Sequence, residues 1–415
     1  MKKLIKHSLS NTFISGGILL TLSNYFVAFL AYVFNFLIAH SMGPAPYGEV
    51  TTLNSYLLIT AVPVNVVMTV LIQKIGSRES DKEAYAHSVV EWGRALIKRW
   101  WFLFVLVFVP IPFMPQITNL SPVVAYVLIP IAVMAFLASL YDAIFQGLKM
   151  FVLFSFLITL QAVLKLSGAV TVTAHLGGLM VVMVCLTLGA ALKLYLSYIL
   201  FERKKPKNAN RQRIEKRAVH ILKDRQLIIS TVSILSITLM NNLDIMFVKK
   251  YFTSYEAGIY SSWSLLAKVV MYFAAPVLMV SYIFFTSSDQ KHNHRKTLVL
   301  SLICIVVIGI CSFLAYSYLG PQLIAVLFGA KFLSLLPFLP LAGIYGGIYL
   351  FAFFLNQYYL SKKKGIVLSL PVFLIIYTIL LFVTGNVLVN IMYINIAVIV
   401  AIPLLFVIGL AFDRD

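Results

Sequence analysis

The chain has 415 residues, of which 61% are hydrophobic and only 11% are charged. Its mean hydropathy is +0.95, far above what a soluble protein of this size needs for its core. Apolar runs long enough to span a bilayer fill nearly the whole length. Because helices satisfy their own backbone hydrogen bonds in lipid, the composition predicts an all-α polytopic membrane protein.

The formal net charge of +19 does not point to DNA or RNA. Most Lys and Arg residues fall in polar segments that the predicted spans bring to one side of the membrane, which is the positive-inside pattern. Segments predicted on the other side hold only Lys249, Lys250 and Lys331. No basic-aromatic recognition module is present. We therefore expect the lipid bilayer as a partner and no nucleic acid.

The apolar runs predict twelve transmembrane helices. The basic N-terminal segment precedes an apolar run that is too long for a cleaved signal peptide, so we interpret that run as the first span. Twelve spans and the positive-inside pattern place both termini in the cytoplasm. The predicted spans are residues 12–39, 47–74, 100–118, 122–147, 151–174, 178–201, 226–249, 256–286, 297–319, 333–360, 366–384 and 387–411.

Two pairs of residues recur at nearly the same offset and indicate an internal repeat. Gly48 matches Gly258 before an apolar run, and Gln146 matches Gln357 near the end of one. The repeat predicts two six-helix halves, 1–201 and 226–415, joined by a basic cytoplasmic linker, 202–225. Because six is an even number, the halves are expected to be related by a pseudo-two-fold axis along the membrane normal. A cavity between such halves opens to either side when they rock.

Three lysines lie inside predicted spans, where a charge is costly and tends to mark function. Lys268 is too deep to reach water easily, Lys165 is also deep, and Lys193 is near enough to the cytoplasmic end to snorkel. We interpret all three as candidates for binding an anionic substrate. The structural alternative is that each lysine pairs with an acid or a carbonyl inside the bundle.

Polar residues accompany these lysines at helical spacing. Steps of four residues place them on the same helix face as the charge, so we expect them to line a cavity. They are Tyr260, Ser264 and Tyr272 around Lys268, and Gln161 one turn before Lys165.

Other polar residues in the spans carry two interpretations. Asp244 and Asn241 lie in the seventh predicted span, where they bind a coupling cation or, for Asp244, pair with Lys268 or Lys249. Amides in the first two spans recur at a spacing of three turns, so they share a face that contacts a sugar or a neighbouring helix. These amides are Asn24, Asn35, Asn54 and Asn65.

Catalytic signatures are missing from the sequence. It contains no P-loop, zinc-binding motif or nucleophile elbow. We therefore predict no catalytic residue, no metal site and no cofactor. Active transport by such a chain has to draw on an ion gradient, the membrane potential or the gradient of the substrate itself.

Three segments resemble a known family. GPAPYGEV follows the first span, LDIMFVKKYFTSYEAGIYS covers the turn between the seventh and eighth spans, and LFGAKFLSLLPFLPLAGIY enters the tenth. With the twelve spans and the repeat, they resemble the polysaccharide-transporter, or O-antigen flippase, branch of the multidrug/oligosaccharidyl-lipid/polysaccharide (MOP) exporter superfamily. The resemblance implies a fold like that of the MATE transporters.

The resemblance also implies a function. A member of this branch flips undecaprenyl-diphosphate-linked oligosaccharide across the bacterial cytoplasmic (inner) membrane by alternating access, for O-antigen, capsule or exopolysaccharide. It works beside polysaccharide assembly proteins such as a polymerase and a chain-length regulator. The lysines suit a diphosphate. The alternatives are a MATE-like ion-coupled drug/cation antiporter, which would prefer an acidic cavity, and a membrane glycan polymerase or acyltransferase, which would show a large external loop or a His/Asp constellation.

Overall fold

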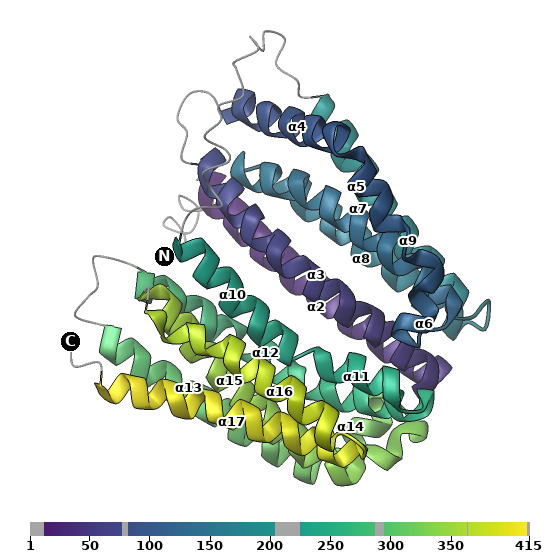
Figure 1. Cartoon of the computed structure of the whole chain (residues 1–415), viewed down its shortest axis with the longest axis vertical. Coiled ribbons are helices and arrows are strands. Elements are labelled where there is room, and N and C mark those ends of the chain that lie inside the picture. The colour runs from purple at the N-terminus through teal and green to yellow at the C-terminus, as the bar shows by residue number, and fades with distance from the viewer. Residues whose placement is uncertain (1–11, 77–81, 204–224, 287–293, 363, 413–415) are drawn as a thin grey trace, which may run out of the picture. The chain divides into compact units, whose positions relative to one another are not determined.

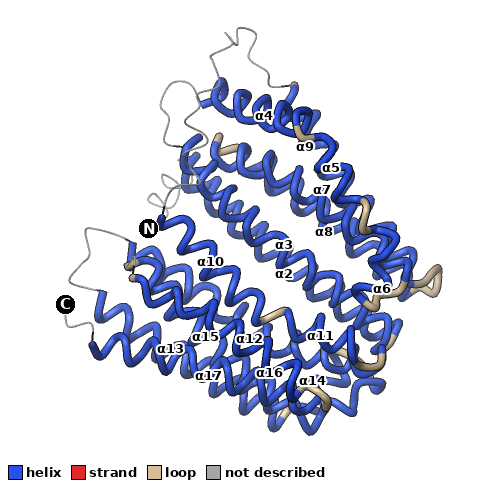
Figure 2. The backbone as a smooth tube through the Cα atoms, viewed as in Figure 1, coloured by secondary structure: helices blue, strands red, loops and turns tan. Residues whose placement is uncertain are grey.

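The structure is almost entirely helical. The computed structural model describes residues 12–76, 82–203, 225–286, 294–362 and 364–412. Within these ranges the backbone forms helices joined by short turns, with no strand (Figure 2). The prediction of an all-α polytopic membrane protein is therefore confirmed. The basic N-terminal segment and most of the predicted linker lie outside the described residues.

The helices up to residue 202 follow the chain order of Figure 1. They are α2 (Thr12–Met42), α3 (Pro44–Gly76), α4 (Lys82–Arg99), α5 (Trp101–Phe108), η1 (Ile111–Phe113), α6 (Met114–Thr118), α7 (Pro122–Gly147), α8 (Phe151–Thr173) and α9 (Leu179–Glu202).

The remaining helices begin at residue 225. They are α10 (Arg225–Met240), α11 (Leu243–Tyr251), α12 (Ser254–Thr286), α13 (His294–Tyr318), α14 (Gly320–Leu327), η4 (Ala330–Phe338), α15 (Leu339–Ser361), η5 (Gly365–Ser369), α16 (Leu370–Thr384) and α17 (Leu388–Phe412).

Helical structure occurs in each of the twelve ranges predicted to cross the membrane. Among the described residues, ten helices are long and apolar enough to do so. The third predicted span is broken into α5, η1 and α6, because Pro110, Pro112 and Pro115 lack the amide hydrogens that a continuous helix needs. The count of twelve spans and the pseudo-two-fold axis stay predictions.

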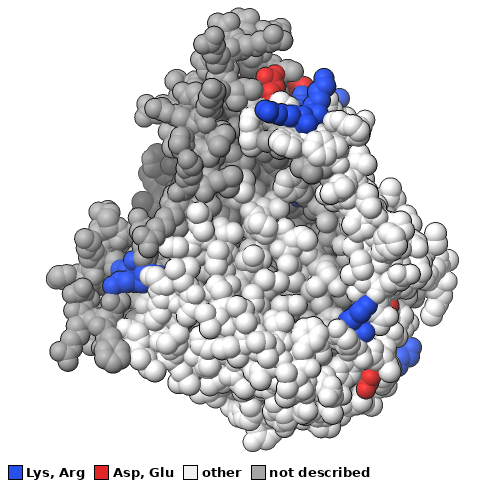
Figure 3. Space-filling view, viewed as in Figure 1, with Lys and Arg blue, Asp and Glu red and all other residues white. Residues whose placement is uncertain are grey.

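The surface of the described residues agrees with a lipid environment. On the face shown in Figure 3, charged side chains of these residues are few and leave a broad uncharged surface. Large apolar side chains are exposed along several helices, as a bilayer requires. Examples are Val152 on α8, Phe273 on α12 and Ile375 on α16.

The chain forms two compact units. Unit 1 comprises the described residues up to Met42 and those from Thr60 through α9. Unit 2 comprises Gly43–Ile59 together with the described residues from α10 onward. The boundary therefore passes through α3, whose first part belongs to unit 2 and whose remainder belongs to unit 1.

In unit 1, the amphipathic helix α4 is tied to the membrane-spanning helices. Its residues Ala86 and Val90 are buried in a cluster with Ile144 and Phe145 of α7. Arg94 on α4 also forms an ion pair with Glu202 at the end of α9. Burial of one face and this ion pair hold α4 against the bundle.

In unit 2, α15 packs on α12 and α13 through glycines. A Cβ atom on Gly346 would lie 2.3 Å from the carbonyl oxygen of Ala267, and one on Gly343 would lie 2.8 Å from the Cα of Phe313. Real side chains do not approach so closely, so only glycine permits these crossings. Small residues allow such close backbone contact between helices in membranes.

We predict that Gly346→Ala destabilises unit 2 by about 1–3 kcal/mol, because the added methyl group meets backbone atoms that cannot move aside freely. The thermal unfolding midpoint of the purified protein in detergent is expected to fall. Gly365→Ala is the matched control, since nothing lies within 4 Å of the position its Cβ would take. Equal midpoints for the two variants would contradict this packing account.

Candidate functional site

The seventh predicted span is interrupted, contrary to the expectation of one continuous helix over 226–249. Helix α10 ends at Met240, Asn241 and Asn242 form a turn, and α11 begins at Leu243. The side-chain amide of Asn242 donates to the carbonyl oxygen of Thr238 at 2.9 Å, replacing a backbone donor of the helix. Asn side chains compete with the backbone for hydrogen bonds in this way. The interruption leaves two helix ends, with opposite partial charges, inside the span.

Asp244 lies in the first turn of α11 and is completely buried, with 0% of its surface exposed. Its Oδ2 accepts a hydrogen bond from the Tyr260 hydroxyl at 2.6 Å and one from the Asn395 amide at 3.2 Å. The Asn395 amide also contacts the Tyr260 oxygen, and the Tyr377 hydroxyl donates to Asn395 Oδ1. A carboxylate inside a span is thus held by neutral hydrogen-bond donors from three other helices.

One oxygen of this carboxylate remains without a partner. Among the described residues, Oδ1 of Asp244 is buried and makes no hydrogen bond. A buried acceptor in that condition costs free energy unless something else satisfies it. The N-terminal end of α11 stabilises the negative charge only in part. Asp244 therefore has capacity to bind a proton or a cation.

Lys268 lies on α12, fourteen residues after its first residue Ser254, or about 21 Å along the helix axis at 1.5 Å per residue. Its Nζ donates to Oδ1 of Asn242 at 3.2 Å. The Asp244 carboxylate is within electrostatic range of this ammonium. An ammonium group has three donors, and the partner recorded for Lys268 is a neutral amide. The group therefore retains capacity to bind an anion.

Aromatic residues fix the other side of the interruption. The Tyr345 hydroxyl on α15 donates to Oδ1 of Asn241 at 3.2 Å. The Tyr345 ring stacks on Trp263 of α12, with centroids 5.5 Å apart, and the Trp263 indole donates to the Phe338 carbonyl. These rigid side chains keep the turn in one conformation.

The remaining predicted residues of unit 2 are placed as follows. Tyr260 and Ser264 are both completely buried, and the Ser264 hydroxyl makes no hydrogen bond to the described residues. Asn54 on α3 is half-buried. Tyr272 lies on α12, but its side chain is outside the described part. In this conformation, Tyr260 and Ser264 therefore face the interior of unit 2, not an open cavity.

In unit 1, Lys165 lies on α8 with its Nζ 4.4 Å from the centroid of the Phe34 ring on α2. This is the geometry of a cation–π contact. Gln161, one turn earlier, is half-buried, as is Lys165. The ring accommodates the charge without neutralising it, so Lys165 can still attract an anion.

Lys193 differs from the other two lysines because an acid neutralises it. Its Nζ lies 2.7 Å from Oδ2 of Asp142 on α7, and both residues are buried. A buried pair of this kind is strongly destabilised when one member is removed. The geometry corresponds to the structural alternative for this lysine.

The amides in the first spans do not behave alike. Asn35 is half-buried, and its amide donates to the carbonyl oxygen of Ala31 in its own helix at 2.7 Å. Asn24 on α2 and Asn65 on α3 are exposed in unit 1. The three-turn spacing alone did not distinguish the amide that bonds its own helix from those that remain accessible.

Sequence reasoning missed several members of the Asp244 network. Asn395, Tyr377 and Tyr345 come from helices far along the chain, and no local spacing connects them with Asp244. The only available signal was an amide within the apolar twelfth span, which predicts a hydrogen-bonded partner. Lys249 was also misjudged as a partner for Asp244, because it pairs with Glu49 on α3 instead.

Among the described residues, no three His, Cys, Asp or Glu side chains gather in a way that would hold a metal ion. The polar network of unit 2 consists of one carboxylate, amides, phenols and an ammonium. An interrupted helix with ionisable side chains inside a multi-pass bundle is the architecture of membrane transporters.

A protein-family model described as "Polysaccharide biosynthesis protein" matches residues 13–282, which is more than half of the chain. The chain therefore belongs to this family, and its fold is that of the MOP exporter superfamily. The resemblance inferred from the sequence is confirmed. A search of curated proteins finds no match.

Solved structures with this fold include transporters and a flippase. An inward-facing multidrug resistance MATE family transporter of the MOP superfamily matches with a TM-score of 0.71 and 12% identity, over 94% of this chain and 96% of that one. The lipid II flippase MurJ in an inward closed conformation matches with a TM-score of 0.67 and 16% identity, over 95% and 87%. At these identities the likeness shows the fold alone.

We predict that Asn395→Leu destabilises the protein by about 1–3 kcal/mol, since it removes hydrogen-bond partners from Asp244, Tyr260 and Tyr377 at once. Thermal unfolding in detergent measures the effect. Asn390→Leu, at an exposed position of the same helix, is the control and should leave the midpoint nearly unchanged. A midpoint for Asn395→Leu equal to that of the control would show that the network contributes no stability.

Proposed function

We propose that this protein is a flippase, and not an enzyme, that moves undecaprenyl-diphosphate-linked oligosaccharide across the bacterial cytoplasmic membrane by alternating access. The observation that carries the proposal is a buried ammonium, Lys268, at the interruption of a membrane span in a chain of the polysaccharide biosynthesis family. The glycan belongs to O-antigen, capsule or exopolysaccharide assembly. The likeness of the fold to that of a lipid II flippase supports a lipid-linked substrate.

A diphosphate is the part of such a substrate that the membrane interior disfavours most. Lys268 is held by a neutral amide, and Lys165 lies over an aromatic ring, so each keeps its charge and its capacity to bind an anion. Ammonium groups bind phosphate as point charges. We assign to Lys268 the principal phosphate contact in unit 2 and to Lys165 a contact in unit 1. Lys193 is assigned a structural role through Asp142.

A coupling ion fits the second half of the network. The free oxygen of Asp244 and the oxygens of Tyr260 and Asn395 offer a proton or an alkali cation one carboxylate and neutral acceptors. Because Asp244 interacts electrostatically with Lys268, neutralising the carboxylate strengthens the net positive field at the lysine. Coupling-ion binding would thereby favour the binding of the anionic headgroup.

The proposed location is the inner membrane, with both termini in the cytoplasm, and the proposed partners are a polymerase and a chain-length regulator of the same assembly system. The substrate is loaded on the cytoplasmic side and released on the opposite side. A drug/cation antiporter is the competing function. The basic character of the residues inside the spans favours an anionic substrate over a cationic one.

Deleting the gene is expected to trap lipid-linked repeat units on the cytoplasmic face, because the diphosphate headgroup crosses a bilayer very slowly unaided. Treating spheroplasts with a membrane-impermeant glycan-modifying reagent measures which face carries them. If the repeat units remain accessible from outside after deletion, the flippase function is wrong. Loss of resistance to cationic drugs without a change in surface glycan would support the antiporter instead.

Lys268→Ala should lower glycan export by roughly tenfold or more, the effect of losing one charge-assisted hydrogen bond, whereas Lys268→Arg should keep most of it. Surface glycan per unit of membrane-inserted protein is the measurement. Lys331→Ala, at an exposed position of the same unit, is the control for a general loss of positive charge. Near-normal export by Lys268→Ala would remove this lysine from the substrate path.

Asp244→Asn preserves the size of the side chain but removes its charge. We expect export by this variant to lose its dependence on the proton or sodium gradient, since the coupling ion no longer has a carboxylate to neutralise. Ionophore titration of export in wild-type and variant cells measures this dependence. An unchanged ionophore response would show that coupling does not pass through Asp244.

A further inference from the structure

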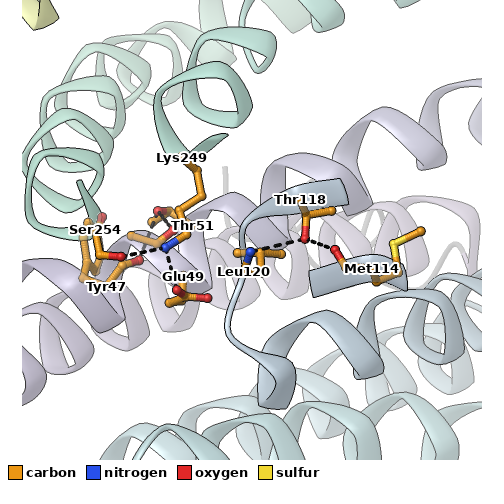
Figure 4. Close-up of polar contacts among 9 residues, drawn as sticks. Tyr47, Glu49, Thr51, Met114, Thr118, Leu120, Lys249 and Ser254 are labelled. Atoms are coloured by element: carbon orange, nitrogen blue, oxygen red, sulfur yellow. Dashed lines mark hydrogen bonds and ion pairs between the residues drawn. The ribbon is translucent and has the colours of Figure 1, made fainter. Parts of the chain in front are cut away.

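The outer part of α3, Gly43–Ile59, carries the most tightly buried ion pair in the described part of unit 2. Lys249 on α11 is 1% exposed, and its Nζ lies 2.6 Å from Oε1 of Glu49 and 3.2 Å from the hydroxyl of Ser254 (Figure 4). Glu49 is 7% exposed. Two charges removed from water in this way attract strongly, and either one alone is costly to bury.

Close backbone packing surrounds the ion pair. A Cβ on Gly48 of α3 would lie 2.9 Å from the backbone nitrogen of Gly258 on α12, and one on Gly258 would lie 1.9 Å from the carbonyl oxygen of Pro44. Gly48 and Gly258 are the two positions that the internal repeat equates. Contact between them requires that both lack a side chain, so the two helix starts meet backbone to backbone.

An aromatic plug completes the attachment. Tyr47 is completely buried, and its ring makes edge contacts with Phe328 and Phe332, at centroid distances of 5.9 Å each. The glycine contact and the plug account for the grouping of Gly43–Ile59 with unit 2 although the rest of α3 belongs to unit 1.

Both ends of this segment have features that permit rotation. Gly43 separates α2 from α3 with a φ of +80°, a backbone conformation that glycine adopts without strain. At the other end, Pro63 lies inside α3 and lacks the amide hydrogen that would bond to the carbonyl of Ile59. The boundary between the units falls directly after Ile59. The residue where the helix changes unit is therefore the one whose helical hydrogen bond is missing.

We propose that Gly43–Ile59 is a gating arm, hinged at Gly43 and Pro63, which the Glu49–Lys249 ion pair latches onto α11 and α12. Release of the latch opens the pathway on the side of the membrane where α3 begins. The proposal rests on alternating access as the proposed mechanism. The ion pair suits a latch because its desolvation cost is recovered when both charges return to water, so the closed and released states can lie close in free energy.

Cysteine accessibility tests the latch without any substrate. In a background with the three native cysteines replaced by alanine, Thr52→Cys provides a reporter on the arm, because Thr52 is completely buried. A membrane-impermeant maleimide applied to intact cells should label it slowly. Glu49→Gln and Lys249→Met should each raise the labelling rate at least about tenfold by destabilising the latched state. The reversed pair, Glu49→Lys with Lys249→Glu, should return the rate toward that of the wild type.

A second reporter distinguishes arm release from general unfolding. Ser236→Cys replaces a serine of α10 that is 3% exposed in the same unit, and its labelling should not change in the latch variants. Equal increases at both reporters would overturn the proposal, and so would an unchanged rate at Thr52→Cys.

Pro63→Ala tests the hinge in a variant that keeps the latch. Restoring the missing helical hydrogen bond should stiffen α3 and reduce labelling of Thr52→Cys several-fold relative to the proline-containing protein. If labelling is unaffected, Pro63 is not the hinge. Labelling is independent of glycan, so failure of the gating arm would leave the flippase function to be decided by the distribution of lipid-linked repeat units.

Discussion

The structure depends on one constraint, which is that every backbone polar group inside the membrane needs a partner. Continuous helices meet this constraint along most spans, and the interruption at Asn241–Asn242 meets it with side chains. The Asn242 amide replaces a backbone donor, and its oxygen receives the Lys268 ammonium. The same residue thus repairs the helix and positions a charge. A site for ions and anionic groups arises where the backbone is least regular.

Around that interruption, the network separates two tasks. Asp244 is surrounded by neutral donors and keeps one oxygen free, whereas Lys268 is held by a neutral acceptor and keeps its charge. Neither charge is cancelled by direct pairing among the described residues. In unit 1, the Asp142–Lys193 pair is the contrasting case, since both charges are consumed in holding α7 to α9. Direct neutralisation distinguishes a structural lysine from one that is available to a substrate.

Sequence periodicity and charge were sufficient for the fold class, the family and most of the helix positions, because membrane spans are specified by local composition. The broken seventh span was missed because Asn241 and Asn242 are tolerated in helices and only the partners Thr238, Lys268 and Tyr345 make the turn favourable. Asn395 and Tyr377 were missed because tertiary packing alone brings them to Asp244. The lysines were found at once, since a charge in an apolar run is visible without neighbours. Their differing roles required the partners, which sequence spacing does not reveal.

Retention of substrate by the purified protein is the most direct test of the central claim, that the Lys268 region binds a lipid-linked diphosphate. Native mass spectrometry of protein extracted from a polysaccharide-producing host would identify the lipid that remains bound. The account predicts an undecaprenyl-diphosphate-linked oligosaccharide on the wild-type protein, and its loss from Lys268→Ala but not from Lys331→Ala. Bulk phospholipid alone on the wild-type protein, or the same diphosphate lipid on both variants, would contradict it.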